Sequence, residues 1–367
     1  DAQSNLSSRP SSQWTTAVDL TVPAPLGRIN AVRELSGGRL IVLEGIDRAI
    51  FLVDEVSGDV RQLGRMGDGP GEYRYPALAF AAGDDSTLVL DGQNRKWYML
   101  HGDAFLGTSD AMRKLQLSMR TVLAGIDRYG NALELEGIGS WSQTEPLRMI
   151  WQPWFADSLR LLRHRPNGQV DTLTRLRGQY LGMNSRVQKR VNGEAISYSL
   201  LNPLQSYDQA VMFSNGAIAV AYFSPYRVDW RSPDGVWTRG RPVPIAAATV
   251  TLEVRRDVAR GYQRDNDGRS VFEPEDFPPW PKVVPPFVRE SVMSGSDGRM
   301  YVKRTRLRDD EPQVIDIFDA STERIASVAH PTAYRFIGAG IRGIYVATRN
   351  EDDEEQLVRL RLVRGSR

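Results

Sequence analysis

The chain has 367 residues, a length that fits two or three ordinary domains or one large β-rich unit. Hydrophobic residues make up 41% and charged residues 25%, ordinary values that exclude a disordered or collagen-like chain. The 47 basic and 45 acidic side chains nearly balance, which argues against a protein that binds nucleic-acid phosphates. The absence of cysteine excludes disulfides, thiolate metal sites and cysteine nucleophiles.

The first segment, residues 1–13, is polar and rich in serine, and the chain starts at Asp1 without a methionine. We interpret this segment as a flexible tail at the start of a mature chain from which a signal peptide has been removed. The sequence contains no run of the roughly 18 to 20 apolar residues that a membrane-spanning helix needs. The expected location is therefore the periplasm or the extracellular space, with membrane association only through a partner.

A short turn followed by a β-rich run recurs along residues 14–367. The turns that precede these runs contain Gly38, Asp85, Gly130, Gly216, Gly298 and Gly343. Three of the five spacings are close to the ~45 residues of a four-stranded propeller blade, and the other two contain long insertions. A second tight turn, such as Asn167-Gly168, follows two strands later and supplies the positive φ angles of a hairpin. The sequence therefore predicts one all-β domain, a six-bladed β-propeller.

Closure of the ring requires both ends of the chain. The last unit contains strand-like runs at 344–348 and 356–364, but no fourth strand follows them. The run at 14–22 is also strand-like and belongs to no other unit. We predict that it forms the outer strand of the last blade.

Part of the sequence resembles a known family. The run LVLDGQNRKWYML, residues 88–100, is similar to the NHL-repeat signature, in which a strand that ends in Asp is followed by Asn-x-Arg. The matching residues are Asp91, Asn94 and Arg95, with a weaker copy in Glu44, Asp47 and Arg48. The glycine-rich stretch 64–76 resembles the inter-blade loop of bacterial six-bladed propellers of the NHL and TolB-like type. The resemblance covers residues 39–100 and implies the fold without implying any chemistry.

The long segments of the sequence are predicted to lie on one side of the ring. In a four-stranded meander, the turns between strands one and two and between strands three and four share a face, which we call the turn face. The other turns and the links between blades lie on the opposite face, which we call the excursion face. The long segments, which all fall in this second class, are 64–76, 138–157, 178–208, 246–289, 306–311 and 349–355. Loops on a rigid scaffold commonly carry function, so the excursion face is the predicted binding face.

Residue types that are enriched at protein interfaces gather in these segments. The candidates in the first large insertion are Trp141, Arg148, Met149, Trp151, Trp154 and Phe155, and Trp280 lies in a proline-rich stretch. The alternative is that the aromatic rings cover the core of their own blade and that the proline-rich stretch, 271–287, is a rigid surface connection. A helix is expected within 249–262, where valines recur every four residues.

Three arginines form a further candidate surface. Arg304, Arg306 and Arg308 alternate along an expected strand and would therefore point the same way. The acidic run 351–355 belongs to the next unit on the same face. The simpler interpretation of both runs is a solvated surface.

The composition of the candidate sites favours binding over catalysis. The three histidines, His101, His164 and His330, show no metal-binding spacing, so we predict no catalytic residue, no metal site and no cofactor. The leading hypothesis is a non-enzymatic, exported scaffold that binds proteins as an extrinsic subunit of a membrane-bound complex. A bacterial photosynthetic reaction-centre assembly is one such complex, although no residue specifies it. The alternatives are a metal-dependent hydrolase or lyase with its site at the central channel, and a propeller that binds a small ligand or glycan.

Overall fold

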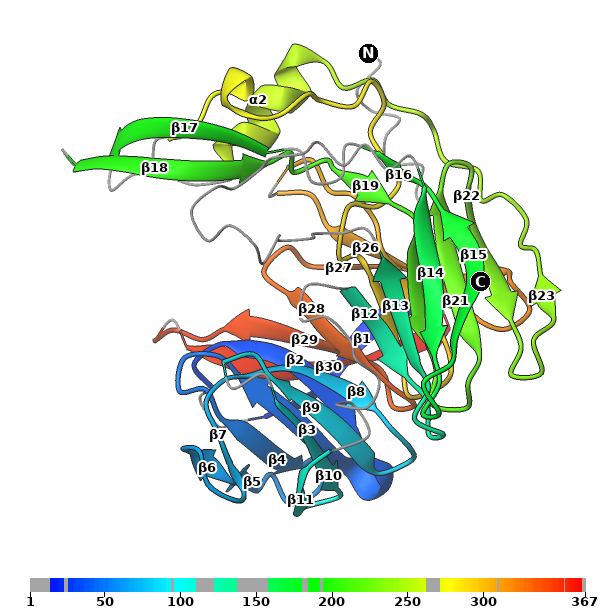
Figure 1. The fold of residues 1–367 in the computed structure, drawn as a ribbon. Coiled ribbons are helices and arrows are strands. Elements are labelled where there is room, and N and C mark those ends of the chain that lie inside the picture. Colours follow the sequence, from blue (N-terminus) through cyan, green and yellow to red (C-terminus); the bar gives the residue numbers. More distant parts are fainter. Residues whose placement is uncertain are drawn as a thin grey trace, which may run out of the picture.

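A computed structural model of the protein describes residues 14–22, 26–93, 96–109, 122–136, 158–179, 184–191, 194–261, 271–308, 310–352 and 354–364. In this part of the chain, six four-stranded antiparallel sheets are arranged radially (Figure 1). The fold is the six-bladed β-propeller that the sequence predicts. No helix among the described residues is long and apolar enough to cross a membrane.

Each blade is a meander of strands that runs from the centre of the ring outward. Blades one and two consist of β2 (Ile29–Glu34), β3 (Arg39–Glu44), β4 (Ile50–Asp54) and β5 (Val60–Leu63), then β8 (Pro76–Ala81), β9 (Ser86–Asp91), β10 (Lys96–His101) and β11 (Ala104–Thr108). Blades three and four consist of β12 (Val122–Ile126), β13 (Ala132–Glu136), β14 (Leu159–His164) and β15 (Val170–Leu176), then β20 (Gln209–Met212), β21 (Ile218–Phe223), β22 (Tyr226–Arg231) and β23 (Trp237–Thr238). Blade five consists of β24 (Val292–Ser294), β25 (Met300–Lys303), β26 (Gln313–Phe318) and β27 (Arg324–His330).

The last blade is built from both ends of the chain, as predicted. It consists of β28 (Arg335–Ala339), β29 (Ile344–Arg349), β30 (Glu355–Arg364) and, outermost, β1 (Trp14–Thr21). The antiparallel register pairs Trp14 with Arg364 and Thr21 with Val358. This pairing joins residues more than three hundred positions apart and closes the ring.

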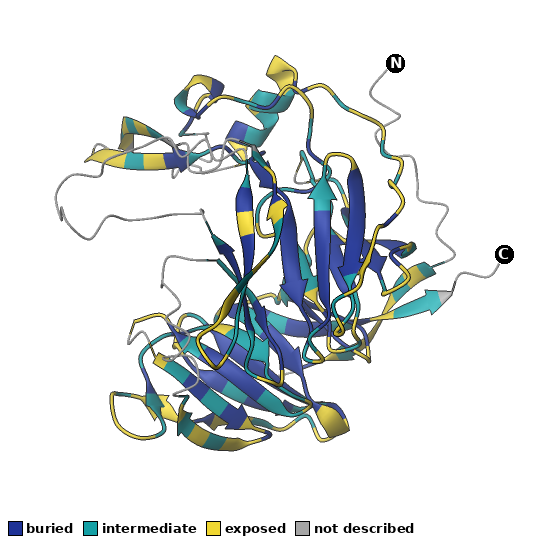
Figure 2. Ribbon diagram, turned by 45° about the vertical axis from the view of Figure 1, so that its right-hand side comes forward, coloured by how far each residue is buried: buried dark blue, intermediate teal, exposed yellow. Residues whose placement is uncertain are grey.

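The burial of the second strands of the blades explains why their sequences are nearly continuous apolar runs. Strands such as β3 (RLIVLE) and β21 (IAVAYF) are buried along most of their length because they lie between two neighbouring blades (Figure 2). The outer strand β11 instead alternates between exposed and half-buried residues. Buried side chains from blades one and six, among them Val42 and Tyr345, form one shared core. The blades therefore stabilise one another across their interfaces.

The innermost strands contact their neighbours all the way round the ring, in the order β2, β8, β12, β20, β24 and β28. Two glycines allow this close approach. A Cβ atom at Gly125 of β12 would lie 2.8 Å from the carbonyl oxygen of Met212, and one at Gly338 of β28 would lie 2.7 Å from that of Val32. Contacts this short do not accommodate a side chain, so glycine is required at both positions.

The predicted turns are also confirmed. The turn at Gly38, part of the 3-10 helix η2 (Ser36–Gly38), joins β2 to β3, and Gly216 lies between β20 and β21. Gly216 has a φ of 89°, which L-residues rarely adopt, so its place in this tight hairpin favours glycine. Because every blade repeats the same strand order, these first turns all lie on the turn face.

The links between blades carry the remaining elements. These are β6 (Arg65–Met66), β7 (Glu72–Tyr73), β16 (Gly178–Gln179), β17 (Asn184–Val191), β18 (Glu194–Leu201), β19 (Ser206–Tyr207), α2 (Leu252–Arg260) and η3 (Pro274–Asp276). The helix expected within 249–262 is confirmed, and its N-cap is Thr251, whose hydroxyl accepts a hydrogen bond from the backbone N–H of Val254 at 3.3 Å. The predicted tail, 1–13, and the insertion 138–157 lie outside the described residues.

Candidate functional site

Two of the long links fold together into one structure on the excursion face, which we call the accessory unit. It consists of the β17–β18 hairpin from the link between blades three and four, with α2, η3 and residues 271–289 from the next link. Figure 1 shows the hairpin projecting beyond the blades with α2 close to it. Segments that are distant in sequence thus share one surface feature.

The accessory unit has a hydrophobic core of its own. Leu200 of β18 and Ala259 of α2 are buried together with Phe272 and Phe277, and the ring of Tyr198 meets Phe272 edge-on at 4.9 Å. An isolated two-stranded hairpin is marginally stable in water, so this packing is what holds β17 and β18 in place. The core is separate from the clusters that join the blades.

Polar contacts fix the hairpin to the proline-rich stretch. Lys189 Nζ lies 2.6 Å from Asp276 Oδ2, and the hydroxyl of Ser185 donates to the carbonyl oxygen of Asp276. Side chains of antiparallel strands alternate between faces, so residues 185, 187 and 189 point toward this core. The alternate residues of β17, Arg186, Gln188 and Arg190, are exposed on the opposite side, which we call the hairpin face.

Trp280, the interface candidate in the proline-rich stretch, is used inside the chain. Its indole packs at 5.5 Å from the ring of Phe277, and its Nε1–H donates to the carbonyl oxygen of Pro274 at 2.9 Å. Asn202 Nδ2 donates to the carbonyl oxygens of Pro278 and Pro279. These contacts hold the stretch together and attach it to the chain that follows β18.

The expected row of three arginines is not formed. Strand β25 ends at Lys303, so the arginines follow in a loop and do not alternate along a strand. Arg304 turns inward because the carboxylate of Asp316 is fully buried, and Arg304 Nη1 lies 3.3 Å from Asp316 Oδ2. Arg308 pairs with Asp310 at 2.8 Å, and Arg306 lies between Arg304 and Arg308 in the same loop.

The aromatic candidates of the first insertion, Trp141, Arg148, Met149, Trp151, Trp154 and Phe155, lie outside the described residues. Topology places their insertion between β13 and β14, as predicted. The described residues contain no group of three or more His, Asp or Glu side chains that could hold a metal ion. His164 contacts the carboxylate of Glu134, and His330 Nδ1 lies 2.9 Å from the carbonyl oxygen of Pro331.

Two residues that resemble the NHL signature, Glu44 and Asp91, have a structural role, whereas Asn94 and Arg95 lie outside the described residues. Glu44, at the end of β3, accepts hydrogen bonds from the backbone N–H groups of Arg28, Ile46 and Asp47. Asp91, at the equivalent end of β9, accepts from those of Arg74, Tyr75 and Gln93. Each carboxylate therefore connects the incoming link to the turn that follows its strand.

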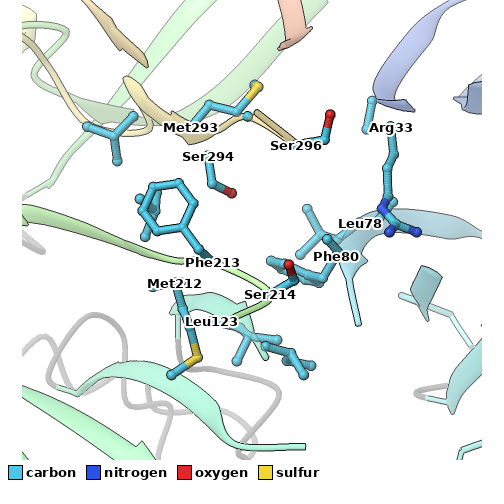
Figure 3. Close-up of a pocket in the computed structure, with 18 of the residues that line it drawn as sticks. Arg33, Leu78, Phe80, Leu123, Met212, Phe213, Ser214, Met293, Ser294 and Ser296 are labelled. Carbon is cyan, nitrogen blue, oxygen red and sulfur yellow. The ribbon is translucent and has the colours of Figure 1, made fainter. Parts of the chain in front are cut away.

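A cavity of about 790 Å³ occupies the central channel. Its lining comes from the innermost strands of all six blades, and many of the lining residues are apolar. Figure 3 shows Leu78, Phe80, Leu123, Met212, Phe213 and Met293 on its wall, together with Arg33 and three serines. Sequence reasoning did not identify this lining, because residues that meet at the centre come from strands about forty or more positions apart.

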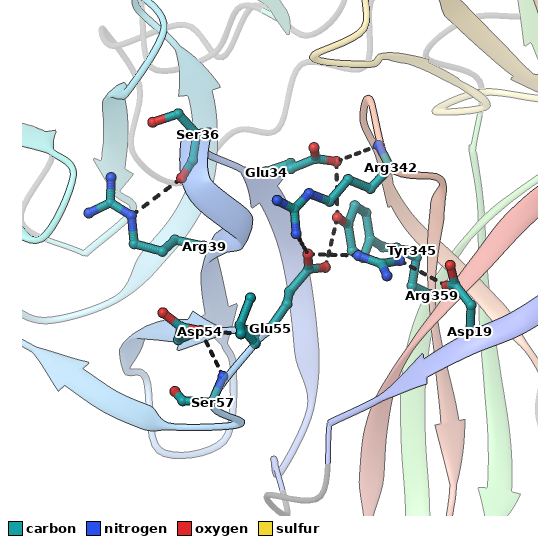
Figure 4. A network of polar contacts seen from close by, with 11 residues as sticks. Asp19, Glu34, Ser36, Arg39, Asp54, Glu55, Ser57, Arg342, Tyr345 and Arg359 are labelled. Atoms are coloured by element: carbon teal, nitrogen blue, oxygen red, sulfur yellow. Dashed lines mark hydrogen bonds and ion pairs between the residues drawn. The ribbon is translucent and has the colours of Figure 1, made fainter.

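A polar network crosses the seam between blades one and six near the turn face (Figure 4). Glu55 Oε2 accepts from Arg342 Nη1 at 2.9 Å and from Arg359 Nη1 at 2.7 Å. Arg359 also donates through Nε to Asp19 of β1 at 2.9 Å. The network thus attaches the outer N-terminal strand to blade one through β30.

Glu34 is a buried carboxyl group in this network whose charged form is disfavoured. Burial raises its pKa above the ordinary value, although the Arg342 N–H and the Tyr345 hydroxyl, at 3.2 Å and 2.9 Å from Oε2, act in the opposite direction. A carboxyl whose pKa is raised by folding releases its proton more readily in the unfolded chain. Its contribution to stability is therefore full at acid pH and is lost as the pH rises through the folded pKa.

We expect Glu34→Gln to remove this pH dependence while its amide oxygen still accepts both hydrogen bonds. The free energy of unfolding of the variant relative to the natural protein should increase between pH 4 and pH 7, as measured by urea denaturation. Glu72→Gln is the control. Its free energy of unfolding relative to the natural protein should decrease as the pH rises, because the Gly69 N–H and Arg65 lower the pKa of Glu72. If the free energies of unfolding of Glu34→Gln and the natural protein changed in parallel with pH, the raised pKa of Glu34 would be contradicted.

Comparison with known proteins supports the fold. No protein-family model and no curated protein matches the sequence. A DUF4221 family member from Bacteroides vulgatus is 8% identical, with a TM-score of 0.50 over 96% of this chain and 99% of that chain. A presumed exported protein from Bacteroides fragilis is 12% identical, with a TM-score of 0.48 over 95% of each chain. A calcium-binding protein, regucalcin, from Agrobacterium tumefaciens is 9% identical, with a TM-score of 0.38 over 96% of this chain and 97% of that chain. At 8% identity, the likeness to the DUF4221 family member shows similarity of fold alone.

Proposed function

We propose that the protein is a non-enzymatic binding propeller that docks another protein on its excursion face, with the hairpin face as the contact. The observation that carries the proposal is the accessory unit. It has a core of its own, and its hairpin projects from the ring and presents a face that does not belong to that core. Ordering a segment away from the main core costs conformational entropy. A role in docking a partner explains why the protein retains such a segment.

The chemistry of the hairpin face indicates an acidic partner surface. Arg186 and Arg190 are exposed there on either side of Gln188, and the described part of the hairpin contains one acidic residue, Glu194. Arginine forms planar, bidentate contacts with carboxylates and is enriched at protein interfaces. Three further points stay predictions. They are that the protein is exported, that its partner belongs to a membrane-bound complex such as a reaction-centre assembly, and that the propeller is of the NHL or TolB-like type.

A photo-crosslinking amino acid at Gln188 tests this proposal in cells of the source organism. We expect one crosslinked protein, attached through an acidic segment, because residue 188 lies in the middle of the hairpin face. The matched control is the same substitution at Val56, which is 82% exposed on the turn face.

A second substitution tests the role of charge. Arg190→Glu in the crosslinking chain should reduce the yield at position 188 at least several-fold, because it places like charges opposite each other. Equal crosslinking at positions 56 and 188, or a yield that does not change with Arg190→Glu, would contradict the proposal. A product that contains only a second copy of this chain would also contradict it.

A further inference from the structure

The central cavity has the size and lining of a small-molecule site. Its volume of about 790 Å³ falls within the roughly 300–1,000 Å³ of ligand pockets, which are mostly apolar with a few polar groups. Leu78, on the wall, is 44% exposed although it lies at the centre of the ring. The rings of Phe80 and Phe213 and the flexible side chain of Met293 extend this apolar surface.

Arg33, near the turn-face end of β2, is the basic residue of the lining, which also includes the acidic residues Glu34, Asp84, Glu290 and Asp297. Arg33 is only 8% exposed, yet none of the described carboxylates lies within ion-pair distance of it. Its Nη2 donates to the carbonyl oxygens of Gly83 and Asp84 at 2.6 Å and 3.0 Å, and its Nη1 donates to the hydroxyl of Thr87. Its Nε is buried and has no hydrogen-bond partner.

A buried cation with an unsatisfied N–H is costly unless an anion neutralises it. The carbonyl and hydroxyl oxygens around Arg33 orient the guanidinium without pairing with its charge. Burial lowers the pKa of Arg33 to about 10, although the nearby carboxylates of Asp85 and Asp84 act in the opposite direction. A group that is oriented in this way beside an apolar cavity suits the recognition of an anionic head on an apolar body. Ser214, Ser294 and Ser296, which also line the cavity, add hydroxyl donors for the same head group.

We propose that the channel binds a small amphipathic carboxylate, with its apolar body against Leu78, Phe80 and Met293 and its carboxylate at Arg33. This function goes beyond the docking of a protein on the excursion face, since it uses none of the accessory unit. The shared chemistry of the ligand is one carboxylate on an apolar body. A flexible acyl chain and a flat aromatic ring are the two forms that the cavity walls allow, and the experiment separates them.

Isothermal titration calorimetry with two matched pairs of probes tests this site. The acids are decanoate and 2-naphthoate, and the neutral controls are decanamide and 2-naphthamide. We expect at least one acid to bind ten or more times as tightly as its amide, because the amide cannot neutralise the guanidinium. The acid that binds identifies the shape of the apolar body.

Variants locate the binding. Arg33→Met should abolish the preference for acid over amide, whereas Arg61→Met should retain it, because Arg61 is paired with Asp103 and does not line the cavity. Met293→Trp fills the cavity without altering Arg33 and should weaken both acid and amide, so the test does not depend on the folding of one variant. Equal binding of acid and amide, no binding of any probe, or binding that Met293→Trp leaves unchanged would overturn the proposal.

Discussion

Replacing Arg359 with methionine should lower the free energy of unfolding by an amount on the order of 3 kcal/mol, because it breaks a buried ion network at the seam. The side chain of Glu55 is 2% exposed and would keep only one of its two arginine partners. Asp19 of β1 would lose its 2.9 Å contact with Arg359 at the same time. Urea denaturation at pH 7, followed by circular dichroism, measures the loss.

Arg361→Met is the matched control for this prediction. Arg361 lies two residues further along β30, is 64% exposed, and approaches the same Asp19 at 3.8 Å. An exposed pair contributes roughly 0 to 1 kcal/mol, so this variant should unfold almost as the natural protein does. Equal losses for the two arginine variants would show that the seam network does not hold the last blade.

Replacing Asp316 with asparagine should have an effect of similar or larger size, about 3–5 kcal/mol. Asp316 is fully buried between blades four and five, where it accepts a hydrogen bond from the hydroxyl of Tyr226 at 2.9 Å. It is also within 3.4 Å of Arg304 and Arg324. Asparagine keeps the shape but removes the charge, so two partly buried guanidinium groups would remain without their counterion.

Asp310→Asn is the control for this second site. Asp310 pairs with Arg308 in the neighbouring loop, but its side chain is 69% exposed. Water already solvates this pair, so its loss should change the unfolding midpoint very little. If the two asparagine variants proved equally stable, the buried network between blades four and five would not be a stabilising element.

The propeller was predictable because its signals are local. Each hairpin has its own turn residues, and strands such as β3 and β21 read as short apolar runs whatever they pack against. The outer strand of the last blade was predictable by elimination, since 14–22 was strand-like and had no other place. These arguments need no knowledge of which residues meet across the ring.

The candidate site was less predictable because it depends on contacts between distant segments. The inward turn of Arg304 follows from a buried carboxylate twelve residues away, which the alternation of arginines does not reveal. The cavity wall combines Leu78, Phe213 and Met293 from three different blades. The hairpin did leave a local signal, since Asn192-Gly193 separates two strand-like runs, a strong sequence pattern for a tight turn.

The pairing of β1 with β30 also has a consequence for biosynthesis. The ribosome makes β1 long before β30, with an interval of roughly 20 to 70 seconds at ordinary elongation rates. Throughout that interval β1 has no partner, and once β30 emerges its own outer edge stays open until β1 arrives. Nascent chains therefore expose this strand to misassociation, and binding by a chaperone near residues 14–21 would protect them until β30 has been made.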